Sequence, residues 1–174
     1  MASAPQGILL GRYRDMQGRG WHRWVRRGLL GLLTLFILLA LLDVFGQHPT
    51  VTRVTAPEAT LELSAPHAVR GGLLWQARFT VTATRELKQA TLVLSRGWLE
   101  NNTVNTIEPS PLGEGSRNGS LTLDLGHIPQ GQRHVLYMEF QTNPTNVGRH
   151  DTDVQLQDGK RLLLSLKRNL TVFP

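Results

Sequence analysis

The feature that most constrains this chain is an uncharged apolar run near its N-terminus. Residues 28–42 read GLLGLLTLFILLALL, without a charged side chain. A helix that crosses about 30 Å of hydrocarbon needs about 20 residues. The flanking residues extend the run to that length, because Arg26 and Arg27 can snorkel to one interface and Asp43 can lie at the other. We therefore predict one transmembrane helix over residues 25–46.

The distribution of charge predicts the orientation of this helix. Residues 1–27 carry six arginines and one aspartate, whereas Arg53 is the one basic residue in the stretch directly after the span. The positive-inside rule then places the N-terminus in the cytoplasm and the C-terminal region outside a cell (plasma) membrane that is crossed once. The residues predicted to anchor the chain in the lipid bilayer are Trp21, Arg23, Trp24, Arg26, Arg27 and Asp43.

A cleaved signal peptide is the alternative to an uncleaved anchor. Val44 and Gly46 are small residues at the two positions that a signal peptidase inspects before Gln47. The basic region before the apolar run is long for a signal peptide, which favours the anchor. Both alternatives export the remainder of the chain.

Composition divides the chain into four segments and excludes several classes of function. We expect a basic tail at 1–24, the span at 25–46, a linker at 47–58 and a β domain at 59–174. Beyond residue 46 there are 13 basic and 11 acidic side chains, which argues against a nucleic-acid partner. The chain has no cysteine, which excludes a disulfide framework, thiol catalysis and a cysteine zinc site.

The β domain is predicted from alternation with a period of two. The clearest example is residues 75–83, where apolar side chains alternate with polar ones. Such alternation indicates a strand with one buried and one wet face. Further strands are expected near 59–65, 90–94, 104–108, 121–125, 133–140, 154–156 and 162–172. Residues 109–119 are expected to form a loop, and Asp158-Gly159 a hairpin turn. Seven or eight short strands with these turns indicate an all-β, antiparallel sandwich.

One stretch also carries a family resemblance. Residues 121–141, LTLDLGHIPQGQRHVLYMEFQ, resemble the strand–turn–strand signature of bacterial immunoglobulin-like modules of the adhesion-related and conserved-repeat type. The whole chain resembles single-pass membrane proteins of high-GC, actinobacterial-type bacteria. The resemblance implies an immunoglobulin-like sandwich that serves as a spacer or binding unit. A single copy argues against a long adhesive stalk.

No catalytic constellation is recognisable. The six histidines lack the spacing of a helical zinc site, although His127 and His134 flank one turn. Asp151, Asp153 and Asp158 resemble a sparse calcium cluster and are better explained as a solvated loop. We therefore predict no cofactor, no metal and no small-molecule substrate.

The candidate partner surface is Trp98 with Asn101 and Asn102, in an irregular stretch. A tryptophan among asparagines on a loop can contact a protein or a glycan. The competing interpretation is that Trp98 closes the end of the sandwich as a core residue. Asn101, Asn118 and Asn169 also begin N-x-Ser/Thr triplets, which arise easily by chance.

These observations favour a non-enzymatic, membrane-anchored extracytoplasmic binding or accessory module for another membrane or envelope protein. Two alternatives stay open. One is a membrane-tethered envelope hydrolase that uses Glu108 and Glu114. Its only support is the predicted location and the presence of scattered carboxylates. The other is an envelope sensor that signals through the basic tail.

Overall fold

The computed structural model describes residues 20–42, 46–100 and 102–174. The chain divides into two compact units, residues 1–46 and residues 47–174. Each unit is described below by itself.

The N-terminal unit contains helix α2, Gly20–Leu41. Its 22 residues correspond to about 33 Å at the usual helical rise. The helix is therefore long and apolar enough to cross a membrane. It begins five residues before the predicted span, because the backbone stays helical through the basic segment around Arg23. It ends at Leu41, five residues before the predicted end of the span. Asp43 lies outside the described residues.

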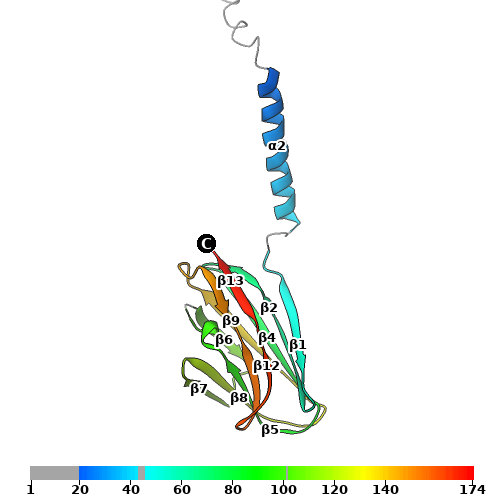
Figure 1. Cartoon of the computed structure of the whole chain (residues 1–174), viewed down its shortest axis with the longest axis vertical. Helices are drawn as coiled ribbons and strands as arrows, with labels where there is room; N and C mark the ends of the chain where they lie inside the picture. The colour runs from blue at the N-terminus through cyan, green and yellow to red at the C-terminus, as the bar shows by residue number, and fades with distance from the viewer. Residues whose placement is uncertain (1–19, 43–45, 101) are drawn as a thin grey trace, which may run out of the picture. The chain divides into compact units, whose positions relative to one another are not determined.

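The C-terminal unit consists of strands and one short helical turn (Figure 1). A five-stranded sheet has the order β1-β2-β4-β9-β6, a second has the order β12-β11-β5-β8-β7, and a small third sheet has the order β10-β13-β3. Within these sheets, only the β13–β3 pair is parallel among the described residues. The elements are β1 (Pro49–Thr55), β2 (Ala59–Pro66), β3 (Ala68–Arg70), β4 (Leu74–Ala83), β5 (Leu87–Leu94), η1 (Arg96–Trp98), β6 (Asn102–Glu108), β7 (Gly113–Arg117), β8 (Ser120–Ile128), β9 (Arg133–Thr142), β10 (Gly148–Asp151), β11 (Val154–Asp158), β12 (Arg161–Leu166) and β13 (Asn169–Phe173).

The strand order is that of an immunoglobulin-like sandwich. In such a sandwich the chain-order strands A, B, E and D form one sheet and G, F and C form the other. Here β2-β4-β9-β6 has the order A-B-E-D, and β12-β11-β5 has the order G-F-C. Strand β1 extends the first sheet, and the β7–β8 hairpin extends the second. The predicted fold class is confirmed.

Two predicted connections are strands instead. The predicted linker 47–58 contains β1, which pairs with β2 from Pro49↔Pro66 to Thr55↔Thr60. The predicted loop 109–119 contains β7, all of whose residues are exposed. Both are edge strands with a wet face and few large apolar side chains, so their sequences lack the alternation by which strands were predicted. The short strands β3 and β10 were not predicted either, and the predicted strand 162–172 is divided into β12 and β13, so the described part of the unit has 13 strands in place of the seven or eight expected.

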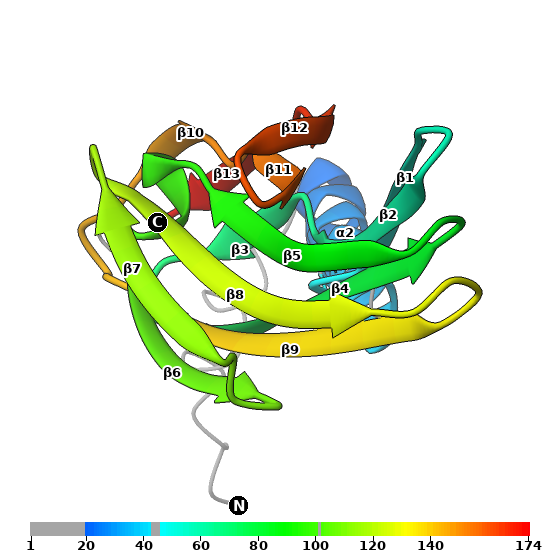
Figure 2. The same ribbon diagram turned by 90° about the horizontal axis from the view of Figure 1, so that it is seen from below.

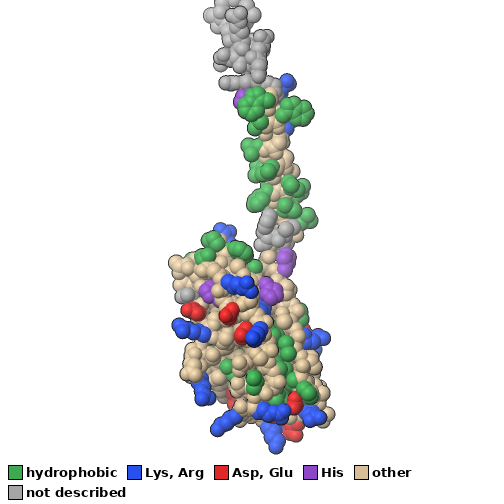
Figure 3. All heavy atoms as spheres, in the orientation of Figure 1, with side chains coloured by type: hydrophobic (Ala, Val, Ile, Leu, Met, Phe, Trp, Pro, Cys, Tyr) green, Lys and Arg blue, Asp and Glu red, His purple; other side chains and the backbone are tan. Residues whose placement is uncertain are grey.

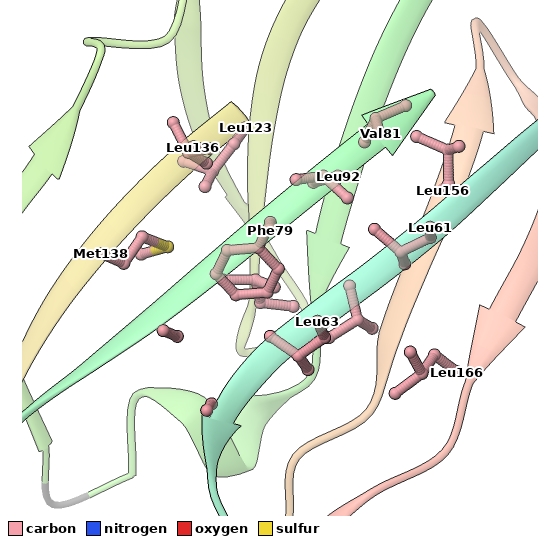
Figure 4. Close-up of a cluster of buried hydrophobic side chains, with 14 of the residues drawn as sticks. Leu61, Leu63, Phe79, Val81, Leu92, Leu123, Leu136, Met138, Leu156 and Leu166 are labelled. Carbon is pink, nitrogen blue, oxygen red and sulfur yellow. The ribbon is translucent and has the colours of Figure 1, made fainter. Parts of the chain in front are cut away.

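The core lies between the two large sheets, which Figure 2 shows as stacked layers. Apolar side chains from both sheets meet there, as Figure 4 shows for Leu61, Phe79 and Val81 of one sheet and Leu92 and Leu156 of the other. All five are fully buried. The alternation of the sequence is thus the alternation between this core and the outer faces of the sheets.

We call the end of the sandwich at which β1 begins the proximal end, and the opposite end the distal end. The proximal end contains the start of β1 and of β4 and the ends of β2, β9 and β13. The distal end contains the end of β1 and of β4 and the start of β9. Strand β4 runs from Leu74 to Ala83, which places the two ends about 30 Å apart.

Candidate functional site

The outer face of the sheet β1-β2-β4-β9-β6 is a broad polar surface with a hollow of about 470 Å³. The side chains that line it project from alternate positions of four adjacent strands, so the pairing register alone brings them together. Threonine and arginine dominate. The lining residues are Arg53, Thr55, Thr60, Glu62, Arg78, Thr80, Thr82, Arg133, Val135 and Tyr137.

One arginine of this face is neutralised within the sheet. Arg53 of β1 lies opposite Glu62 of β2 and forms an ion pair with it, in which Nε donates to Oε2 at 3.0 Å. Because Arg53 is largely exposed, this pair contributes little to stability. On the outer face, the two charges of this ion pair neutralise each other, so neither is available to a ligand.

Two further arginines have no such partner. Among the described residues, neither Arg78 nor Arg133 has an ion pair within 4.0 Å. Arg78 of β4 lies directly opposite Tyr137 of β9, whose ring is 39% exposed. Arg133 lies opposite Thr82, four positions further along β4. The two guanidinium groups therefore leave hydrogen-bond donors and positive charge available to a ligand.

The surface continues toward the proximal end. A second hollow of about 400 Å³ shares Arg78 and Tyr137 with the first and reaches Gln47 at the start of the unit. On the other side, Glu139 lies opposite Gln76, and Glu108 lies opposite Tyr137. The face therefore has positive charge over β4 and the start of β9, and carboxylates along its β6 side.

This arrangement suits recognition of a surface more than chemistry on a small molecule. Tyrosine and arginine are the residue types most enriched where proteins bind each other. Both hollows are open and lie on the polar outer face of a regular sheet, whereas small-molecule sites are concave and mostly apolar. Among the described residues, no group of three or more potential ligands could hold a metal ion.

Trp98 of the predicted partner surface lies in the core. Trp98 is 0% exposed, and its ring packs 5.3–5.8 Å from the rings of Trp75, Phe79 and Phe140. Its indole N–H donates to the carbonyl of Asp153 at 3.1 Å. Of the two interpretations of Trp98, the partner surface is therefore wrong and the core residue that closes the end of the sandwich is confirmed, because turn η1 folds its ring into the proximal end of the core.

Of the two asparagines in that prediction, the structure describes Asn102. Asn102 is half-buried and donates from Nδ2 to the carbonyl of Trp98 at 3.3 Å. It therefore braces the same turn. Asn101 lies outside the described residues.

The predicted anchor residues fall in the first turns of α2. Trp21 and Trp24 are 62% and 72% exposed, and the Arg27 guanidinium lies 5.6 Å from the centre of the Trp24 ring. Arg23 and Arg26 are exposed as well. The helix thus carries its basic side chains and its two tryptophans together at one end.

The other candidate groups are engaged elsewhere. His127 contacts Glu86 at 2.9 Å rather than His134. Asp153 accepts from the backbone N–H of Arg168, and Asp158 accepts from that of Gln89. Glu108 and Glu114, the predicted carboxylate pair, lie on β6 and β7 of different sheets.

Arg168 is a buried charge that the sequence pattern did not indicate. It is 4% exposed, and its Nη2 donates to the carbonyls of Ala65, at 2.7 Å, and Pro66. Burial lowers the pKa of Arg168 to about 10. The side chain therefore ties the β12–β13 connection to the end of β2.

His134 should make the stability of the sandwich depend on pH. It is half-buried on β9, and burial lowers its pKa below the ordinary value of 6.5. The unfolded chain then binds more protons than the folded chain as pH falls through 6.5, so stability is present above that pH and is lost toward the folded pKa. We expect His134→Leu to reduce the drop in melting temperature between neutral and mildly acidic buffer. The same change at exposed His127 is the control, and an equal reduction there would contradict the assignment.

No family model matches the chain, and no curated protein matches it in sequence. Among solved structures, it is similar to the CARDB domain of a Pyrococcus furiosus protein, with a TM-score of 0.45 and 13% identity over 68% of this chain and 97% of that one. It is also similar to CaCohA2 from Clostridium acetobutylicum, with a TM-score of 0.44 and 12% identity over 72% and 91% of the two chains. The fold class rests on the strand order itself.

Proposed function

We propose that this chain is a single-pass membrane protein of a bacterial envelope, with its N-terminus in the cytoplasm and its sandwich outside. In this proposal the sandwich is a non-enzymatic module that binds another membrane or envelope protein. The observation that carries the proposal is the outer face around Arg78, Arg133 and Tyr137. In this proposal helix α2 anchors the chain, and the arginines beside it determine its orientation in the membrane.

The chain between helix and sandwich supports a partner in the same membrane. Since β1 replaces most of the predicted linker, only residues 42–48 connect Leu41 to Pro49. Seven residues span at most about 25 Å when fully extended. The binding face therefore stays near the bilayer, where a laterally placed membrane protein meets it.

The charge of the face predicts the chemistry of that partner. Arg78 and Arg133 are exposed and unneutralised, and Tyr137 lies beside Arg78. An arginine guanidinium group binds a carboxylate through bidentate hydrogen bonds, and an exposed tyrosine ring adds contact area. We expect a partner surface that presents acidic side chains over β4 and the start of β9.

Site-specific cross-linking in the native membrane tests this assignment. A photo-reactive phenylalanine analogue at Tyr137 of the full chain should capture a discrete partner, whereas the same analogue at Leu162, which is 52% exposed on the other sheet, should not. Arg78→Glu should reduce the Tyr137 cross-link at least about tenfold, because like charges that meet in an interface are strongly unfavourable. Arg117→Glu, an exposed charge reversal on β7, is the matched control.

Two outcomes would contradict the proposal. Equal capture from Tyr137 and Leu162 would show that the outer face is not the binding surface. A Tyr137 cross-link that survives Arg78→Glu as well as it survives Arg117→Glu would show that the guanidinium groups do not recognise the partner.

A further inference from the structure

The proximal end of the sandwich exposes a group of large apolar side chains. Of the eight such side chains exposed in the described part of the β unit, four lie there, with exposed fractions of 47–55%. We call them the apolar rim: Leu73, Leu74, Val147 and Phe173. Figure 3 shows hydrophobic side chains gathered over this end of the unit.

Backbone contacts hold the rim together, although its members are far apart in sequence. The N–H of Gly71 donates to the carbonyl of Phe173 at 2.7 Å, and the N–H of Thr142 donates to the carbonyl of Leu73 at 3.2 Å. Val147 precedes Gly148, which pairs with Val172 on the last strand. Three separate segments thus converge on one surface: the β3–β4 turn, the β9–β10 connection and the end of β13.

The rim lies at the end of the sandwich to which the helix is connected. Strand β1 begins at this end, where Pro49 pairs with Pro66, the last residue of β2. The seven residues between Leu41 and Pro49 limit the distance from the end of the helix to this end of the sandwich to about 25 Å. If α2 crosses a bilayer, the surface within reach of the rim is the interface of that bilayer.

Charged side chains beside the rim fit an interface. Arg70 pairs with Phe173 across the β3–β13 ladder, and Arg149 lies opposite Thr171 of the same strand. Both are exposed, as is Glu100 on a neighbouring turn, whose carbonyl accepts from Asn146. Glu100 is ion-paired with Arg96 at 3.9 Å, so the charges of Arg70 and Arg149 are in excess beside the rim and favour anionic headgroups over a neutral surface.

We propose that the apolar rim inserts into the headgroup region of the bilayer that holds α2. This rests on the proposed membrane anchoring. The bilayer is the expected occupant because the short connection brings it within reach, whereas the polar face of the five-stranded sheet is the surface assigned to a protein. If the proximal end contacts the membrane, the strands point away from it. The polar outer face of the five-stranded sheet is then directed parallel to the membrane, toward neighbouring membrane proteins.

Single-cysteine labelling tests the contact, and the cysteine-free chain suits it without further change. The full chain is reconstituted in nanodiscs of phosphatidylcholine and phosphatidylglycerol that contain a lipid spin label either near the headgroup, to probe the rim, or at the end of the acyl chain, to probe the middle of the span. An environment-sensitive fluorophore is attached in turn to Leu73→Cys, Phe173→Cys, Leu162→Cys and, within α2, Leu35→Cys. Leu162 is exposed to a similar degree as the rim, at 52%, and lies near the start of β12 toward the distal end.

We expect the lipid quencher to act on the Leu73 and Phe173 labels at least about twofold more than on the Leu162 label, since interfacial side chains penetrate about 5–10 Å. Iodide in the buffer should show the reverse order. If the Leu35 label is quenched by lipid while the two rim labels behave like Leu162, the rim contact is wrong and the anchor stands. If the Leu35 label is not quenched by lipid, the anchor itself is wrong.

Discussion

Replacing Trp98 with alanine should lower the free energy of unfolding of the sandwich by about 3–5 kcal/mol, the range for a buried aromatic side chain. Trp98 is 0% exposed and packs against three aromatic rings at the proximal end. Its removal leaves a cavity there and leaves the carbonyl of Asp153 without its indole donor. Urea unfolding of the full chain in mild detergent, followed by near-ultraviolet circular dichroism, measures the loss.

Two further variants make this result specific. Leu112→Ala removes a side chain that is 78% exposed and should change stability by no more than about 0.5 kcal/mol. Trp98→Phe keeps a ring but loses the donor, so its effect should lie between those of the two alanine variants. If Trp98→Ala were as stable as Leu112→Ala, Trp98 would not belong to the core.

Two arginines in the middle of α2 should abolish export of the sandwich. Leu33 and Ile37 lie one turn apart, and each arginine at the centre of a span costs about 2.5–3.5 kcal/mol on insertion scales. We therefore expect the chain with Leu33→Arg and Ile37→Arg to fail to insert. The measurement is the reaction of a Leu112→Cys sandwich with a membrane-impermeant maleimide in intact spheroplasts.

In the parent chain this cysteine should react from outside, whereas in the double-arginine chain it should react only after lysis. Leu33→Ala with Ile37→Ala keeps the span apolar and should behave like the parent. Labelling of the parent only after lysis would contradict the proposed orientation. Labelling of the double-arginine chain from outside would contradict the role of the helix.

The parts of the fold that were predictable are those in which one strand face is buried. Residues 75–83 alternate because Phe79 and Val81 enter the core while Arg78 and Thr80 stay outside. Strands β1 and β7 were not predictable in this way, because an edge strand owes its place to backbone hydrogen bonds with a neighbour. Those bonds leave no pattern in the side chains.

The candidate binding face was not predictable for a different reason. Arg53, Arg78 and Arg133 come together only because β1 pairs with β2, β2 with β4, and β4 with β9. Alternation shows that each side chain points outward, but it contains no information on which strands are neighbours. For Trp98 the irregular stretch with polar neighbours left both a surface and a core position open, and the core position is confirmed because turn η1 folds the ring inward.

The pairing of β1 with β2 has a mechanical consequence. In the proposed arrangement, a pull between α2 in the membrane and a partner on the outer face would reach the sandwich at Pro49 and draw β1 along its own axis. The seven residue pairs from Pro49↔Pro66 to Thr55↔Thr60 then bear the force side by side, rather than opening one after another. This shear geometry resists tension, because detaching β1, the strand into which the connection 42–48 leads, requires many hydrogen bonds to break together.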